Sequence, residues 1–307
     1  MDYILSTNNL TKQYGKHKAV DNVSIHIRQG DIYGLIGRNG AGKTTILRII
    51  SGLAAPTSGE FSLFGKTGAA ANHVMNRVGT LIEAPGIYAN MSAAENVRLK
   101  CVAMGVRKKD AVEELLKIVG LENTGRKAVK NFSLGMKQRL GIALALVGDT
   151  DLVVLDEPIN GLDPQGIAEI RQTIERLNKE KGITFIISSH ILEELSKMAT
   201  SYGIIHHGQL LQEFTNEELV AKCTERIEIQ TDLTAKACTV LEKMGITRYK
   251  VTDKSTVEIY ERLDEVTPIA AQLAADGVSF RGISLQNEAL EDYFLGLTGE
   301  SGGADNV

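Results

Sequence analysis

Three short segments of the chain are apolar without alternation: YGLIG at 33–37, LVVLD at 152–156 and TFIIS at 184–188. A strand with one solvent-exposed face alternates apolar and polar residues. An unbroken apolar run therefore indicates a strand of a parallel sheet that is buried on both faces. A segment with helical spacing follows each run, and these segments begin at Lys43, Pro164 and His190. Strand, turn and helix in alternation predict an α/β domain.

A mostly helical stretch at about 88–148 interrupts this alternation, and we interpret it as a helical subdomain. Further along, SYGIIHHGQLLQEF predicts two edge strands joined by a turn at His207 and Gly208. We expect His206 and His207 to be exposed residues of that turn.

The pattern of predicted elements changes again from about residue 225. The apolar pattern there predicts the order β-α-β-β-α-β followed by a last helix, with the final strand at VSFRGIS (278–284). This order is the split βαβ arrangement of a small α+β domain. We therefore divide the chain into 1–214, a C-terminal accessory domain at 215–298, and a polar tail at 299–307 that is expected to be disordered.

Composition narrows the classes of function. The chain has 307 residues and a formal net charge of −4, which gives no support for a non-specific nucleic-acid binder. Its three cysteines are far apart and lack C-x-x-C spacing, so they are expected to be free thiols in a reducing cytosol. No apolar run has the length of a membrane span, and the N-terminus lacks the layout of a signal peptide. If the protein works at a membrane, another chain must hold it there.

The segment GRNGAGKTT at 37–45 satisfies the phosphate-loop pattern G-x-x-x-x-G-K-[ST]. Its glycines let the backbone wrap closely, so that its N–H groups and the N-terminus of the next helix face phosphates. Lys43 supplies a positive charge, and the Thr44 hydroxyl can bind Mg²⁺. The alternative is a glycine-rich turn with an unrelated lysine, but the strand before the loop and the helix after it favour the phosphate site.

The segment DLVVLDEP supplies acidic groups for the same site. Asp156 ends a predicted buried strand, where a carboxylate is costly unless it faces a cation or hydrogen-bond donors. We interpret it as a Mg²⁺ ligand, and Glu157 as the group that polarises the attacking water. Without the phosphate loop, an ordinary turn at a strand end would be the simpler interpretation.

The segment FSLGMKQRLGIALAL at 132–146 points to a family. A Ser-x-Gly element that opens a helix just before the acidic strand resembles the signature of ABC-type ATPases. Leu134 and Met136 depart from the usual S-G-G-Q form, whereas Ser133 and Gly135, whose hydroxyl and amide meet nucleotide in that family, are kept.

Other positions match that family in the same order. The resemblance implies that Tyr14 stacks on adenine, that Asp163 of NGLDP links two sites across a dimer, and that His190 contacts the γ-phosphate. Taken singly, Tyr14 is more typical of surface packing and His190 of an ordinary strand end. The matching motifs cover about residues 3–214.

The resemblance implies an α/β phosphate-loop NTPase core of ABC type, with a mostly parallel buried sheet. It also implies an antiparallel N-terminal β region, a helical subdomain and a small appended C-terminal α+β domain. ATP and Mg²⁺ are the implied cofactors. The residues expected to bind nucleotide are Tyr14, Gly37, Asn39, Gly40, Ala41, Gly42, Lys43, Thr44, Thr45, Ser133, Gly135 and Asp163. Those expected to bind metal are Thr44, Asp156 and Glu83, and those expected to act in hydrolysis are Glu157, His190 and Glu83.

Glu83, in TLIEAPGIY, stands where ABC ATPases usually place a glutamine that reaches Mg²⁺ and the attacking water. The acid resembles a feature of one branch, the ATPases of bacitracin-type and lantibiotic-immunity exporters. The ending LEDYFLGLTG is similar to that branch as well. The alternative is a tolerated local change in an ABC ATPase that exports another substrate.

The resemblance implies an ATP-hydrolysing subunit that forms an ATP-dependent dimer with a second copy of itself. It would dock on a separately encoded transmembrane permease near residues 84–100, and so lie in the cytoplasm on the inner face of the membrane. A soluble ABC protein acting on DNA or ribosomes is the less favoured alternative, because the chain has neither a coiled-coil insert nor a second cassette. A GTPase is also disfavoured, since no N-K-x-D motif is present. The C-terminal domain can serve dimerisation, permease contact or ligand sensing, and the sequence does not choose among these.

Overall fold

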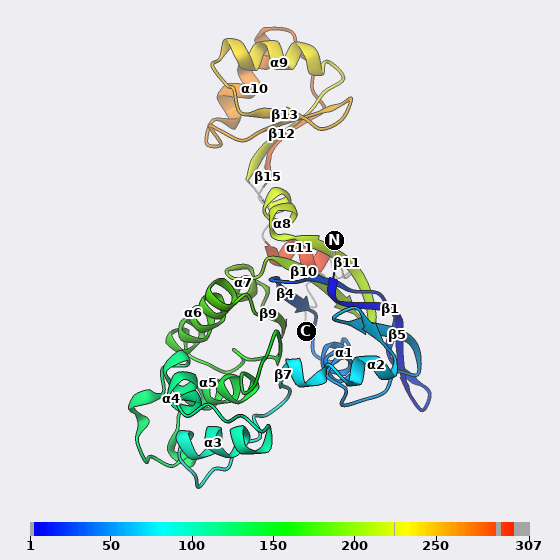
Figure 1. Ribbon diagram of the computed structural model, residues 1–307. Coiled ribbons are helices and arrows are strands. Elements are labelled where there is room, and N and C mark those ends of the chain that lie inside the picture. Colours follow the sequence, from blue (N-terminus) through cyan, green and yellow to red (C-terminus); the bar gives the residue numbers. More distant parts are fainter. Residues whose placement is uncertain (1–2, 224, 287–289, 298–307) are drawn as a thin grey trace, which may run out of the picture. The chain divides into compact units, whose positions relative to one another are not determined.

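The computed structural model describes residues 3–223, 225–286 and 290–297 (Figure 1). The chain forms two compact units, Met1–Asn216 and Glu217–Val307. Each unit has a hydrophobic core of its own. The candidate site lies in the first unit.

A six-stranded sheet forms the centre of the first unit, in the order β11-β10-β4-β9-β8-β7. Its strands are β4 (Ile32–Ile36), β7 (Val78–Leu81), β8 (Leu152–Asp156), β9 (Thr184–Ser189), β10 (Ser201–His206) and β11 (Gln209–Thr215). All neighbouring pairs are parallel except the β10–β11 hairpin. Every residue of β4, β8 and β9 is buried, which confirms the interpretation of the three unbroken apolar runs.

A second, antiparallel sheet contains the N-terminal strands, as expected. Its strands are β1 (Tyr3–Tyr14), β2 (His17–Val23), β3 (His26–Arg28), β5 (Ser58–Leu63) and β6 (Lys66–Thr67). Helix α1 (Lys43–Ile50) contributes Ile46, Leu47, Ile49 and Ile50 to a core that also includes residues of β1, β2 and β8. Because α1 is packed against both sheets, its N-terminus is held at a fixed position beside the phosphate loop.

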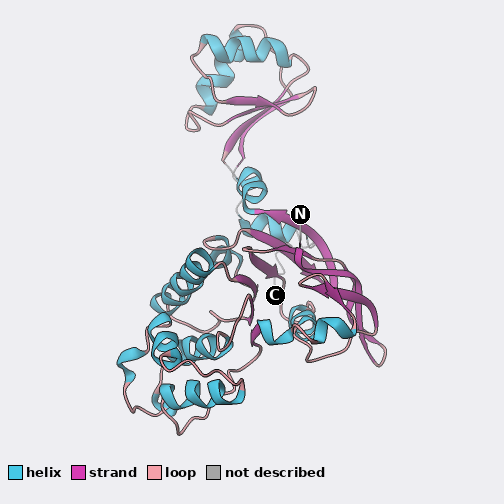
Figure 2. Cartoon of the chain, in the orientation of Figure 1, coloured by secondary structure: helices cyan, strands magenta, loops and turns pink. Residues whose placement is uncertain are grey.

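The remaining helices of the first unit lie beside these sheets (Figures 1 and 2). They are α2 (Ala69–Asn72), α3 (Ala93–Ala103), α4 (Ala111–Ile118), α5 (Leu134–Ala145), α6 (Pro164–Lys181) and α7 (Leu192–Ser196), with 3-10 turns at Met75–Arg77, Glu122–Thr124 and Val129–Asn131. Helices α3, α4 and α5 gather together and make up the expected helical subdomain (Figures 1 and 2). Pro164 at the first position of α6 and Gly182 in the left-handed region after it begin and end that helix.

The helix predicted from His190 is shorter than expected, and that prediction was wrong in its extent. Ile191 has an extended backbone, and its N–H donates to the Ser189 hydroxyl, so the helix starts only at Leu192. By Thr200 the backbone N–H donates to the carbonyl of Ile32, which draws the chain into the sheet.

Helix α5 approaches strand β7 very closely. A Cβ on Gly79 would lie 1.9 Å from the carbonyl oxygen of Ala145, and a Cβ on Gly141 would lie 2.9 Å from a methyl group of Leu81 and 3.0 Å from Pro85 Cβ. Glycine at these two positions therefore brings helix and strand into direct backbone contact.

The second unit follows the predicted order. Its elements are α8 (Asn216–Cys223), β12 (Arg226–Gln230), α9 (Thr234–Lys243), β13 (Tyr249–Val251), β14 (Thr256–Ile259), α10 (Val266–Ala275), β15 (Gly282–Gln286) and α11 (Leu290–Leu297). The sheet order is β13-β14-β12-β15, antiparallel throughout. Helices α9 and α10 lie on one face of this sheet, over Ile227, Ile229, Val257 and Ile259 (Figure 2).

The last strand of the prediction was misplaced. Val278 does not begin a strand; its N–H donates to the carbonyl of Leu273, and its side chain is buried in the core after α10. Pairing with β12 starts at Gly282 instead. The predicted tail at 299–307 lies outside the described residues.

Three further predictions concern side chains and membrane spans. Cys101 is buried and Cys238 half-buried, both are free thiols, and burial raises the pKa of each. The side chain of Cys223 lies outside the description.

His207 is exposed in the β10–β11 turn as predicted, but His206 is half-buried at the end of β10. Within the described ranges, no helix combines the length and the apolar character that crossing a membrane requires.

Candidate nucleotide site

The phosphate loop at 37–42 joins β4 to α1, and its glycines are required by geometry. Gly42 has φ +109°, and a Cβ there would lie 2.4 Å from the carbonyl oxygen of Ala19. A Cβ on Gly37 would lie 2.5 Å from the carbonyl oxygen of Ile205. Gly40 also has a positive φ, +82°, but a Cβ there would meet no atom within 4 Å. The loop is thus packed on its inner side and open on its outer side, where a phosphate group can approach.

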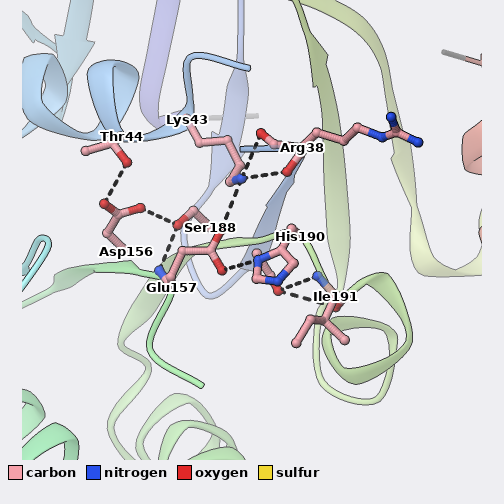
Figure 3. Close-up of polar contacts among 10 residues, drawn as sticks. Arg38, Lys43, Thr44, Asp156, Glu157, Ser188, His190 and Ile191 are labelled. Atoms are coloured by element: carbon pink, nitrogen blue, oxygen red, sulfur yellow. Dashed lines mark hydrogen bonds and ion pairs between the residues drawn. The ribbon is translucent and has the colours of Figure 1, made fainter. Parts of the chain in front are cut away.

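Lys43 is the buried cation of the site (Figure 3). Its Nζ donates to the carbonyl oxygens of Gly37 at 2.5 Å and Arg38 at 3.3 Å, and it lies 3.1 Å from Oε1 of Glu157. A charged group that is only 5% exposed needs such partners, because desolvation penalises an isolated charge. The ammonium is therefore held in place by the loop that it serves.

Asp156 and Thr44 offer oxygen ligands to a cation. The Thr44 hydroxyl donates to Oδ2 of Asp156 at 2.8 Å, and the Ser188 hydroxyl donates to Oδ1 at 2.6 Å (Figure 3). Asp156 ends the buried strand β8 and is only 6% exposed. Mg²⁺ prefers a few carboxylate and hydroxyl oxygens completed by water and phosphate, so this pair fits that ion.

Glu157 and His190 lie at the ends of the neighbouring parallel strands β8 and β9. Nδ1 of His190 is 2.8 Å from Oε2 of Glu157. Glu157 has φ +48°, a left-handed conformation that costs about 1–3 kcal/mol in a non-glycine residue and is typical of functional sites. Oε1 of Glu157 is buried and, apart from the ion pair with Lys43, has no hydrogen-bond donor among the described residues.

Ser188 is a site residue that the sequence analysis missed. Its hydroxyl accepts from the backbone N–H of Glu157 at 2.9 Å while donating to Asp156, so it joins the two acidic residues. Its position opposite Asp156 in the β8–β9 register makes this possible. The signal in the sequence is a pair of serines that end an otherwise apolar strand.

The signature residues lie at the start of α5. The Ser133 hydroxyl accepts from the N–H of Met136 at 3.2 Å and caps the helix, and Gly135 lies against Leu162. Asp163 caps α6 through the N–H of Gly166 at 2.9 Å. Ser133, Gly135 and Asp163 line one hollow of about 450 Å³. Within the described part of the chain, they share no hydrogen bond or ion pair with Lys43 or Glu157.

The other predicted nucleotide residues lie in the loop, in α1 and at the end of β1. Asn39 is exposed, Ala41 is buried, and Thr45 lies half-buried in the first turn of α1. Tyr14 ends β1, its ring is 49% exposed, and the Lys12 ammonium lies 5.1 Å from the ring centroid.

Glu83, which the sequence analysis expects to reach Mg²⁺, pairs with an arginine of α1. It follows β7 with φ +65°, and its side chain is 61% exposed and forms an ion pair with Arg48 of α1. Among the described contacts, no hydrogen bond joins it to Thr44 or Asp156.

A second hollow, of about 280 Å³, lies between β7 and α5 and reaches α3. Pro85, Gly86, Lys100 and Met104 form part of its wall, as does Leu53, which is 64% exposed. We refer to it as the β7–α5 hollow.

The comparisons with known proteins agree with this geometry. The family described as ABC transporter matches residues 20–160. The chain is 42% identical to the bacitracin transport ATP-binding protein BcrA of Bacillus licheniformis, over 97% of this chain and 98% of that protein. It is 44% identical to the lantibiotic transport ATP-binding protein SrtF of Streptococcus pyogenes, over 68% of this chain and 90% of that one. The dimeric structure of MJ0796, a bacterial ABC transporter cassette, is 25% identical, covers 69% of this chain and 98% of its own, and has a TM-score of 0.63.

The chain therefore belongs to the ATP-binding proteins of ABC transporters. Its first unit is an ATPase cassette of that family, as the sequence analysis predicts.

Proposed function

We propose that the chain hydrolyses Mg·ATP to power a separately encoded membrane permease that removes peptide antibiotics of the bacitracin or lantibiotic type. The observation that carries the proposal is the cluster of Lys43, Thr44, Asp156, Glu157 and His190. The similarity to BcrA and SrtF supports the choice of cargo.

Each group of the cluster has a defined task in hydrolysis. Backbone N–H groups of the phosphate loop and Lys43 would hold the phosphates, and Thr44 and Asp156 would hold Mg²⁺, which would neutralise phosphate charge. Glu157 accepts a proton from the attacking water, and His190 orients that carboxylate through its 2.8 Å contact. Tyr14, exposed at the end of β1, is proposed to stack on the adenine ring.

The signature hollow supports a composite site made by two copies. Ser133 and Gly135 present a hydroxyl and an amide at the N-terminus of α5, a position that favours anions. Because every chain carries both the phosphate loop and the signature, two copies related by a two-fold axis complete two sites. The dimeric form of the related cassette is consistent with this assembly.

The β7–α5 hollow is the proposed docking surface for the permease. Near it, exposed apolar side chains include Leu53 and Met104, and Val102 of α3 is 71% exposed. These exposed apolar groups beside a hollow are the feature that supports a protein contact there. Docking there would hold the chain at the cytoplasmic face of the membrane.

The experiment compares wild type with Glu157→Gln. We expect the purified variant to form a dimer with Mg·ATP, measured by light scattering, and to revert to monomer when EDTA is added. A variant that stays monomeric at saturating Mg·ATP contradicts the proposed mechanism. Glu180→Gln, at an exposed position near the end of α6, is the matched control for the change of charge.

The cargo is tested in cells that express the chain together with its permease. We expect wild type and Glu180→Gln to raise tolerance to bacitracin or a lantibiotic, and Glu157→Gln to remove that gain. If ATPase activity is normal but tolerance to both peptides is unchanged, the proposed ATPase activity stands and the proposed peptide cargo is rejected.

A further inference from the structure

Helix α1 holds two acidic residues from two different segments. Thr44 in its first turn donates to Asp156 after β8, and Arg48 pairs with Glu83 after β7. Residues four apart lie on the same face of a helix, so Thr44 and Arg48 project from one side of α1. The metal ligand Thr44 and the partner of Glu83 are thus one helical turn apart on a single rigid element.

Glu83 is held in a specific conformation at that place. Its φ of +65° is rarely adopted by a non-glycine residue, and its only polar partner among the described residues is Arg48, which contacts it through Nη2. The position that the resemblance assigns to a metal ligand is therefore occupied by an acid already paired with a cation.

We propose that Arg48 is a positioning residue that competes with Mg²⁺ for Glu83. In the nucleotide-free chain, Arg48 keeps the Glu83 carboxylate one helical turn along α1 from Thr44. When Mg·ATP binds, the carboxylate leaves Arg48 and turns toward the metal held by Thr44 and Asp156. This inference rests on the proposed function, because it requires Mg·ATP to bind at the phosphate loop.

The Arg48–Glu83 ion pair is weak enough for the carboxylate to move from Arg48 to Mg²⁺. Both side chains are substantially exposed, Arg48 at 40% and Glu83 at 61%, and an ion pair in water is weak because solvent screens it. It is strong enough to bias where a flexible carboxylate lies, and weak enough to be replaced by a divalent cation.

The test measures binding rather than turnover. A fluorescent, non-hydrolysable ATP analogue is titrated at a series of Mg²⁺ concentrations, and the half-saturating Mg²⁺ concentration is recorded. We expect Arg48→Ala to lower that concentration about two- to fivefold, the range that an exposed ion pair provides. Arg48→Lys, which retains the charge, should stay close to wild type.

The double variant separates the proposed competition from a simple charge effect. A simple charge effect of Arg48 would shift the Mg²⁺ dependence equally whether or not the Glu83 carboxylate is present. We expect Arg48→Ala to have no effect on Mg²⁺ dependence in the Glu83→Gln background, where the carboxylate is absent. An equal shift in both backgrounds, or no shift in wild type, overturns the inference. Thermal unfolding without nucleotide verifies that each variant is folded.

Failure of the proposed function and failure of this inference give different results in the binding experiment. If wild type does not bind the analogue at any Mg²⁺ concentration, the proposed function fails. If binding is normal and only the coupling between Arg48 and Glu83 is absent, the proposed function stands and this inference alone is rejected.

Discussion

Nζ of Lys43 lies 3.1 Å from Oε1 of Glu157. The proposed phosphate-binding cation is thus paired with the carboxylate proposed to activate the attacking water. Under the proposed function, a nucleotide that enters the loop competes with Glu157 for Lys43.

We therefore expect Glu157→Gln to change binding and hydrolysis in opposite directions. Loss of the competing charge should tighten ATP binding, while loss of the base should slow hydrolysis about 10²- to 10⁴-fold. Fluorescent nucleotide binding and phosphate release measure the two effects. Weaker binding in this variant would show that Glu157 does not compete for Lys43. Lys43→Met should lose binding altogether.

Gly40 and Gly42 of the phosphate loop should differ in how well they tolerate substitution by alanine. Gly40→Ala adds backbone strain without a clash and should cost about 1 kcal/mol of unfolding free energy. Gly42→Ala adds strain and a Cβ 2.4 Å from a carbonyl oxygen, so we expect about 3 kcal/mol. Urea unfolding of both variants is the measurement, and equal costs would contradict the packing described for Gly42.

Ser188→Ala should impair hydrolysis and stability together. The change removes the hydroxyl that joins Asp156 to the backbone of Glu157, and leaving buried polar groups without a partner costs about 1–3 kcal/mol. The hydroxyl of the neighbouring buried Ser189 bonds to the backbone of Ile191 and, among the described contacts, not to Asp156 or Glu157, so Ser189→Ala is the matched control. A larger loss of phosphate release in the control than in Ser188→Ala would refute the assigned role.

The capping box of α3 gives a prediction that depends on pH. The Ser92 hydroxyl accepts from the N–H of Glu95, and the carboxylate of Glu95 accepts from the N–H and hydroxyl of Ser92. These bonds to the backbone and side chain of Ser92 lower the pKa of Glu95. Ser92→Ala should destabilise the protein by about 1 kcal/mol.

The sign of the pH effect follows from the lowered pKa. The contribution of the Glu95 carboxylate is present above the usual glutamate pKa and is lost as the pH falls through the pKa in the folded chain. The stability difference between wild type and Ser92→Ala should therefore shrink in acid, measured by urea unfolding across a pH series. A constant difference would show that Glu95 adds nothing to the cap.

Much of the fold was predictable because burial leaves a direct trace in the chain. Strands β4, β8 and β9 are buried on both faces, and their sequences are unbroken apolar runs. The order of elements in the second unit was likewise visible. The errors lie at element ends, where single hydrogen bonds decide. The bond from Ile191 to Ser189 delays α7, and Val278 is drawn into the core instead of beginning β15.

The site was predictable where a motif is contiguous and not where it depends on tertiary contact. Lys43, Thr44 and Asp156 come together as their motifs predict. Ser188 and Arg48 carry no motif; their importance comes from strand register and helical phase, which bring them to residues more than thirty positions away. For the same reason, the sequence indicated that Glu83 is unusual but not that an arginine is its partner.

The close contact of α5 with β7 has a mechanical consequence. The helix runs without interruption from Leu134, beside the signature serine, to Ala145, whose carbonyl oxygen leaves no room for a side chain on Gly79. A partner that displaced α5 at the β7–α5 hollow would therefore also move Ser133 at the other end of the helix, together with strand β7, which leads into Glu83.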